Sequence, residues 1–244
     1  MKSPGLLSAV SALLLVGGCT DSDRRSNTDA GADAAPIGMD GMMTMDAGVE
    51  ALIPGLLELT TNCTVASNGK YAPDSGDAAT IDICRLNGAY FWQADLDVDC
   101  DGQMTSECNL GTDPYYQNQT SFTQSDGQPL IASALPFVVL PIPSSRFSFV
   151  DADIQPGAVV AVIYQGKLVF GVFGDEGPSS VIGEGSYAMA NSLGIDPNPK
   201  TGGIDSGVTY FAFVGADAVA DPIEDHQAAT TRGQMLAATL LQSN

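Results

Sequence analysis

The sequence predicts a mainly β protein with short helices at its periphery. The chain has 244 residues, of which 27 are Gly and 14 are Pro, and only 7% are aromatic. This composition favours short strands joined by many turns over a helical bundle. Short apolar runs bounded by turn residues recur through the second half of the chain, and such runs are typical of buried strands.

Four of these runs define the expected strands. The run 135–140 (LPFVVL) is closed by Pro141 and is typical of a buried strand. The runs 159–164 (VVAVIY) and 168–173 (LVFGVF) flank a short turn that contains a glycine, which predicts a β-hairpin. The run 208–214 (VTYFAFV) predicts a fourth strand.

Two helices are expected among the strands. The segment 186–193 begins at a serine, which favours helix N-termini, and is followed by Gly194, which favours helix ends. The segment 227–242 places Met235, Leu236 and Leu240 on one face. We expect His226, the only histidine, to be a surface residue of this last helix and not a catalyst.

The net charge excludes several classes of protein. With 29 acidic and 9 basic residues the chain carries −20, so it lacks the clustered cations that a nucleic-acid binder needs. A single histidine excludes zinc sites of the His-rich kinds. An acidic surface instead favours a cationic partner. We predict no metal and no cofactor.

The N-terminus has the features of an export signal. Lys2 precedes an apolar stretch of eleven residues, 6–16, which is too short to span a bilayer and has the length of a signal-peptide core. It leads into Val16-Gly17-Gly18-Cys19, which resembles the lipobox of bacterial lipoproteins. The resemblance implies a signal peptide over residues 1–19 and lipid attachment at Cys19. Ordinary secretion, with an incidental cysteine, is the alternative.

Membrane attachment is therefore expected through the lipid alone. Thr20 follows the cysteine where Asp would signal inner-membrane retention, so we expect the outer membrane or the cell surface. Residues 20–52 are rich in Asp, Ala, Gly and Met, lack aromatic residues and predict a disordered tether. The folded domain is expected over residues 53–244. From residue 51 onward the chain has 22 acidic and 6 basic residues, so the domain itself is acidic.

Four cysteines remain in the expected domain, and an exported domain with four cysteines predicts two disulfides. Three pairings are possible. We favour the two local ones, Cys63–Cys84 and Cys100–Cys108, because short loops require least from the rest of the fold. No pair has the CxxC spacing of a zinc site.

Two carboxylates in the second half are candidates for catalysis. Asp175 directly follows a predicted strand, Gly177-Pro178 turns the chain, and Glu184 precedes the first predicted helix. Two acids fixed at element ends on either side of a turn suit glycosidic-bond cleavage, in which one donates a proton and the other activates water or attacks the sugar. Spacing alone leaves solvated loop acids as the alternative.

At these residues the sequence resembles a known family. The run AVIYQGKLVFGVFGDEGPSSVIGEGSYAMANSLGI, the following DPNPKTGGIDSGVTY and the upstream NGAYFWQADLDVDCDGQ are similar to the chitosanases of glycoside hydrolase family 75. The resemblance covers about residues 85–215. It implies endo-hydrolysis of β-1,4-linked glucosamine polymers with inversion, acting on chitosan or partially deacetylated chitin. The two essential acids of the family motifs correspond to Asp175 and Glu184. Glu176 departs from the family, which usually has an uncharged residue there.

An upstream aspartate run is the expected binding site for the cationic sugars. In a strand, alternation would put Asp95, Asp97 and Asp99 on one face, and we expect Trp92 to stack on a sugar ring. Two other readings of the run stay open. One is a turn held by Cys100–Cys108, and the other is a calcium loop, although the twelfth position of that loop is a cysteine and not Glu. Asp205, before the last strand, is a further candidate.

The roles of the two acids are assigned by hypothesis. We expect Glu184 to donate the proton and Asp175 to act as base, although a helix that begins near Ser186 would favour an ionised Glu184.

The element order also resembles the double-psi β-barrel of rare lipoprotein A-like domains and family 45 endoglucanases, which implies a six-stranded double-psi-like barrel with short peripheral helices. That likeness leaves two alternatives: a peptidoglycan-cleaving enzyme, which the acidic charge disfavours, and a non-catalytic lipoprotein that binds glycan or calcium.

Overall fold

The computed structural model describes residues 45–244. The predicted signal peptide, Cys19 and most of the predicted tether lie outside the described residues. The folded unit begins before residue 53, where the sequence analysis placed its start, because helix α1 (Met45–Glu50) precedes that point. Val49 and Leu52 pack against the core, so apolar side chains extend the domain toward the N-terminus. Among the described residues, no helix is both long and apolar enough to cross a membrane.

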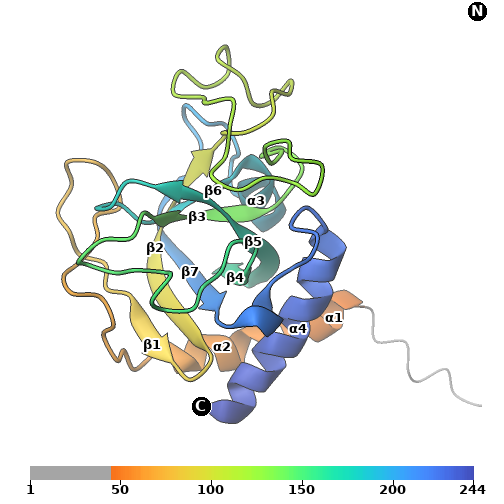
Figure 1. Ribbon diagram of the computed structural model, residues 1–244. Coiled ribbons are helices and arrows are strands. Elements are labelled where there is room, and N and C mark those ends of the chain that lie inside the picture. The colour runs from red at the N-terminus through yellow and green to blue at the C-terminus, as the bar shows by residue number, and fades with distance from the viewer. Residues whose placement is uncertain (1–44) are drawn as a thin grey trace, which may run out of the picture. The chain divides into compact units, whose positions relative to one another are not determined.

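Six strands close into a barrel, as predicted (Figure 1). Around the ring the order is β2-β6-β3-β5-β4-β7, and β7 pairs back to β2. A seventh strand, β1, adds to the outer side of β2. The bounds are β1 Cys84–Leu86, β2 Ala89–Asp99, β3 Phe137–Pro141, β4 Val159–Tyr164, β5 Lys167–Gly177, β6 Glu184–Ser186 and β7 Ile204–Phe213.

The connections make the barrel double-psi-like. In the ring β6 lies between β2 and β3, while β3 lies between β5 and β6. The connection from β2 to β3 passes over β6, and the connection from β5 to β6 passes over β3. The two connections therefore cross, as in a double-psi barrel. The pairs β2–β6 and β3–β5 are parallel, and the remaining pairs are antiparallel.

Short helices surround the barrel, as predicted. They are α1, α2 (Ile53–Leu59), α3 (Tyr187–Leu193), the 3₁₀ turn η1 (Ala216–Ala218) and α4 (His226–Ser243). The Ser186 hydroxyl accepts a hydrogen bond from the Met189 N–H and caps α3, which ends at Gly194 in the left-handed conformation. Asp225 caps α4 in the same way, by accepting from the Ala228 N–H.

Alternation along the strands sorts the buried side chains into an inner and an outer set. Val160 and Val162 of β4 belong to the cluster that fills the barrel with Trp92 and Tyr210. Their neighbours Val159, Ala161 and Ile163 face outward and pack with α2 and α4. Where no helix covers the barrel, outward-facing side chains can therefore line a groove at the surface.

Both expected disulfides are present, Cys63–Cys84 and Cys100–Cys108. The first ties the segment after α2 to β1. The second lies at the start of a long connection, residues 100–136, which runs from β2 to β3 without a helix or an extended strand. Connections of this length in a compact domain are usually functional.

Candidate active site

Three carboxylates lie in one row across four neighbouring strands. Asp97 of β2 is in register with Glu184 of β6, Glu184 is in register with Val139 of β3, and Val139 is in register with Asp175 of β5. Register partners point to the same face of a sheet. The two predicted catalytic residues therefore face the same way, on either side of Val139.

A β-bulge gives Asp175 this direction. Val138 pairs with Phe173, but Val139 pairs with Asp175, so Gly174 is an extra residue in β5. Phe173 points into the barrel. In regular alternation Asp175 would point inward as well, and the extra residue turns it to the outer face.

Backbone amides hold the Asp175 carboxylate in place. Oδ1 accepts hydrogen bonds from the Ser121 N–H at 2.8 Å and from the Glu176 N–H at 2.7 Å. The side chain is only 6% exposed. The two amide donors therefore fix the orientation of this carboxylate.

Glu184 has different surroundings. It is the first residue of β6 and is partly buried. Burial, together with the negative charges of Asp97, Asp101 and Asp175, raises the pKa of Glu184 to about 7. A carboxyl group with such a pKa still holds its proton in weakly acidic solution.

The strand register fixes the spacing of the pair. Asp175 and Glu184 are separated by two strand spacings, which places their Cα atoms about 10 Å apart. Inverting glycosidases hold their carboxyl groups about 6.5–9.5 Å apart, whereas retaining enzymes hold them at about 5–5.5 Å. Two strand spacings are compatible with the wider separation that inverting enzymes use.

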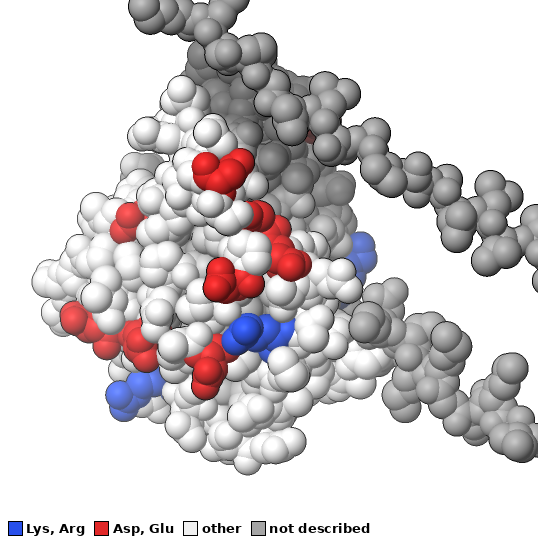
Figure 2. Space-filling model, turned by 45° about the vertical axis from the view of Figure 1, so that its right-hand side comes forward, with Lys and Arg blue, Asp and Glu red and all other residues white. Residues whose placement is uncertain are grey.

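Asp175 and Glu184 line an acidic groove of about 520 Å³. Lys200 is its one basic side chain among the described residues. Among the charged side chains on the face of the molecule that Figure 2 shows, acidic ones predominate. The carboxylates of the groove come from three strands and two connecting segments: Asp74, Asp97, Asp99, Asp101, Asp113, Asp175, Glu176 and Glu184.

Burial, with repulsion between neighbouring carboxylates, raises the pKa values of the predicted aspartate run. Burial raises the pKa of Asp97 to about 6, with added repulsion from Asp74 and Asp205, and burial likewise raises the pKa of Asp101 to about 6. Burial also holds the pKa of Asp99 well above its usual range. Binding of cations or protons stabilises a groove of this kind, because it reduces the repulsion between the carboxylates.

The expectation for Trp92 is wrong. Trp92 is 2% exposed, and its ring stacks on Tyr210 inside the barrel with 5.1 Å between the ring centroids. No face of the indole is free to meet a sugar.

An aromatic residue that the sequence analysis missed lies in the groove instead. Tyr115 is 87% exposed and lines the groove. Its N–H donates to Asp113 Oδ1, and the neighbouring Tyr116 hydroxyl donates to the Gly102 carbonyl at 2.7 Å. Its loop is thus held on both sides.

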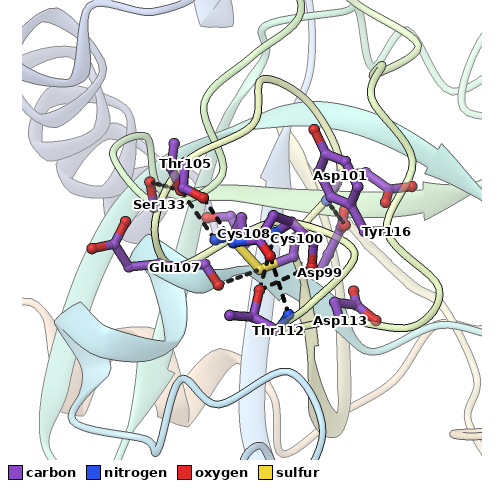
Figure 3. The surroundings of a disulfide bond; sticks show 12 residues. Asp99, Cys100, Asp101, Thr105, Glu107, Cys108, Thr112, Asp113, Tyr116 and Ser133 are labelled. Atoms are coloured by element: carbon purple, nitrogen blue, oxygen red, sulfur yellow. Dashed lines mark hydrogen bonds between the residues drawn. A yellow bond between two sulfur atoms is a disulfide. The ribbon is translucent and has the colours of Figure 1, made fainter.

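The calcium-loop reading does not fit the structure. Asp97 and Asp99 belong to strand β2, not to a loop. Asp99 Oδ1 accepts from the Asp101 N–H, and Asp101 Oδ1 accepts from the Gln117 N–H, so both carboxylates organise the backbone. Figure 3 shows Asp99, Asp101 and Asp113 around the Cys100–Cys108 bond. The reading of a turn held by the disulfide therefore applies to the end of the run.

Two further residues singled out in the sequence lie away from Asp175 and Glu184. Asp205 is at the start of β7 and lines a smaller hollow together with Asp95, outside the acidic groove. His226 begins α4, where its Nε2 lies 3.0 Å from the Phe170 carbonyl oxygen. It takes no part in the groove.

A barrel with two spaced carboxylates in an acidic groove is compatible with a glycoside hydrolase. Residues 96–239 match the family model described as fungal chitosanase of glycosyl hydrolase group 75, and the chain belongs to this family. It is 32% identical over 168 residues to endo-chitosanase B of Aspergillus oryzae, covering 64% of this chain and 69% of the relative.

Other relatives agree with the family assignment. Endo-chitosanase C of Aspergillus oryzae is 36% identical over 138 residues, which cover 54% of this chain and 33% of that longer protein. An endo-chitosanase of Aspergillus fumigatus is 29% identical over 171 residues, covering 63% of this chain and 67% of the relative. Among solved structures, the Streptomyces papain inhibitor matches with a TM-score of 0.33 and 16% identity, over 54% of this chain and all of the inhibitor.

Proposed function

We propose that the protein is an endo-chitosanase that hydrolyses β-1,4 linkages between glucosamine residues of chitosan or partially deacetylated chitin with inversion. The observation that carries this proposal is the placement of Asp175 and Glu184 on either side of Val139, facing one groove. The relatives named endo-chitosanase support the substrate class.

In the proposed mechanism Glu184 is the acid. Its proton passes to the glycosidic oxygen as the bond from that oxygen to the anomeric carbon breaks. The raised pKa of Glu184 supports this role. The concern that helix α3 would favour an ionised Glu184 is reduced, because the Ser186 hydroxyl, and not Glu184, caps that helix.

Asp175 is the proposed base. It takes a proton from the water that attacks the anomeric carbon from the opposite face, so a new hydroxyl of inverted configuration forms there. The two amide donors to Oδ1 hold the carboxylate in place, and Oδ2 would receive the proton.

The acidic groove accounts for the proposed substrate. Chitosan carries ammonium groups in weakly acidic solution, and the carboxylates of the groove would offset them. Peptidoglycan is not a polycation and gains less from this surface.

The proposed location is the cell envelope, with a lipid on Cys19 as the only membrane attachment. The lipobox-like sequence over residues 16–19 supports it. Labelling with a radioactive fatty acid in a bacterial host should mark the wild-type chain and leave Cys19→Ala unlabelled. Equal labelling of both would contradict the anchor without affecting the proposed chemistry.

The catalytic proposal is tested by reducing-end release from chitosan, chitin and peptidoglycan. Asp175→Asn and Glu184→Gln should each lose about 10²–10⁴-fold in activity on chitosan while the melting temperature holds. Asp151→Asn is the matched control, because this exposed acid lies outside the groove. Proton NMR of the first products should show the α-anomer. A β-anomer first, or release from peptidoglycan only, would overturn the proposal.

A further inference from the structure

Three aspartates come together beside the acidic groove: two of them line it, and the third lines the smaller hollow that contains Asp205. Asp74, Asp95 and Asp97 each present a carboxylate oxygen, and these three oxygens all lie within 4.8 Å of one another. Asp95 and Asp97 belong to β2, whereas Asp74 comes from the loop between Tyr71 and Ile81. The cluster thus joins the barrel to a separate segment of the chain.

Asp95 is the member that points to a ligand. Its side chain is 4% exposed, yet its Oδ1 has no hydrogen-bond partner among the described residues. The Gly183 backbone covers this oxygen so closely that a Cβ at Gly183 would overlap it. A buried carboxylate oxygen without a partner costs free energy, so such groups are normally paired or bound to a metal.

No basic side chain offsets the charge of the cluster. Within residues 45–244 the one ion pair is Lys70–Asp82, which involves none of the three aspartates. The loop that carries Asp74 is already fixed at its base, because Tyr71 and Ile81 pair through their backbones at 2.8 Å. The carboxylate of Asp74 is therefore held near the barrel without a cation from the protein.

The donor set suits a hard divalent cation. Carboxylate oxygens are the usual ligands of Ca²⁺, at about 2.3–2.6 Å. Two oxygens bound to one Ca²⁺ can be at most about 5 Å apart, and all three oxygens lie within 4.8 Å of one another. Mg²⁺ requires shorter bonds of about 2.0–2.1 Å and a stricter octahedron, so its oxygens lie closer together.

We propose that Asp74, Asp95 and Asp97 bind one Ca²⁺, which fixes the loop 71–81 to β2 beside the groove. This site differs from the EF-hand-like reading of Asp97, Asp99 and Asp101, since it uses Asp74 and the buried Asp95. The inference does not depend on the proposed chitosanase activity, because it concerns stability and not hydrolysis.

The test measures the melting temperature and the bound Ca²⁺ of the full-length protein after treatment with EDTA. In 10 mM CaCl₂ the melting temperature should rise by about 5–10 °C, and equilibrium dialysis should find one Ca²⁺ per chain. MgCl₂ at the same concentration should give a smaller rise. Equal rises would indicate general screening of the acidic surface and would overturn the proposal.

Variants locate the site. Asp74→Asn and Asp95→Asn should lose the Ca²⁺-dependent rise, and Asp101→Asn, the matched control, should keep it. Asp74 is exposed, so its variant should fold even if the one at Asp95 does not. A full rise in Asp74→Asn, or a loss in Asp101→Asn alone, would overturn the assignment. Neither readout requires substrate, so a failure here is separate from a failure of the chitosanase proposal.

Discussion

Asp175 and Glu184 are both outward-facing carboxylates, but their oxygens meet different neighbours. Asp175 accepts from two backbone amides, while Glu184 is surrounded by other acids and by buried surface. Donors stabilise a negative carboxylate, and repulsion together with burial stabilises a protonated one. The different surroundings of these two similar residues support the opposite roles proposed for them.

The raised pKa of Glu184 predicts the alkaline limb of the pH profile. The acid must be protonated, so turnover of a soluble glucosamine oligomer should be present below pH 7 and should fall as the pH rises through about 7. Asp101→Asn removes a neighbouring negative charge and should shift this limb to lower pH. The measurement is kcat against pH, in EDTA so that no cation lies beside Asp97.

The comparison with Asp101→Asn distinguishes titration of the enzyme from titration of the substrate. The amines of the substrate titrate alike in both assays, so they cannot cause a difference between the two profiles. Asp151→Asn should leave the limb where it is in the wild type. A limb that does not move in Asp101→Asn would show that another group limits turnover.

Tyr115 is predicted to contact the aminosugar. An ammonium group over an exposed aromatic ring contributes about 0.5–1 kcal/mol. Tyr115→Ala should therefore raise KM for chitosan about two- to fivefold with little change in kcat, and Tyr115→Phe should restore it. Leu110→Ala, on the same loop and also exposed, is the control. An equal effect of both alanine variants would show that only the loop, and not the ring, matters.

The spacing between Trp92 and Asp95 already argues against the expectation that Trp92 stacks on a sugar. Residues three apart in a strand face opposite ways, so the pattern that puts Asp95, Asp97 and Asp99 outside puts Trp92 inside the barrel. Tyr115 gave no comparable signal, because its exposure depends on how a loop without helix or strand folds against the barrel.

At the scale of elements, the strands with continuous apolar runs could be predicted and the others could not. β4 was predicted with its observed bounds, and the hairpin with β5 was also predicted. β6 has three residues, too few for any period to show. The register that aligns Asp97, Glu184 and Asp175 depends on the bulge at Gly174. The local sequence does not determine whether Gly174 pairs regularly or forms a bulge.

Two glycines of β5 should separate folding from chemistry. A Cβ at Gly174 would lie 2.7 Å from Phe137 Cβ, so Gly174→Ala should lower stability by about 1–3 kcal/mol. A Cβ at Gly177 would lie 2.8 Å from Glu184 Oε2, at the flexible end of that side chain. Gly177→Ala should keep most of the stability but lower kcat on chitosan about tenfold or more by displacing the acid.

Urea unfolding and chitosan kinetics on both variants check this pair. A Gly177→Ala protein with normal kcat would show that the position of Glu184 tolerates displacement, which the proposed acid role does not allow.

At the scale of the whole molecule, charge is the dominant property. The excess of acids was evident from composition, and the structure shows that eight of them line one groove. Composition could give the sign of the partner's charge. The gathering of acids from distant segments, such as Asp74 and Asp175, is a consequence of barrel closure and could not be read from sequence.

Salt should therefore weaken substrate capture more than turnover. The Debye length falls from about 10 Å at 0.1 M to about 3 Å at 1 M salt. Between 0.05 and 1 M NaCl, KM for chitosan should rise about tenfold or more, while kcat at saturation stays within about twofold. The melting temperature serves as the control for the fold. A KM that does not respond to salt would place substrate recognition outside the acidic groove.

The long connection 100–136 divides the groove between two kinds of structure. The barrel strands form a floor that carries both acids, whereas the connection forms a wall, closed at its base by Cys100–Cys108 and reaching Asp175 through the Ser121 amide. The sequence of the connection can thus change in evolution independently of the sequence of the barrel strands. Relatives could exchange the wall to accommodate sugars of different acetylation while the reaction beneath it stays the same, and a grafted connection that keeps the Ser121 contact should transfer substrate preference between them.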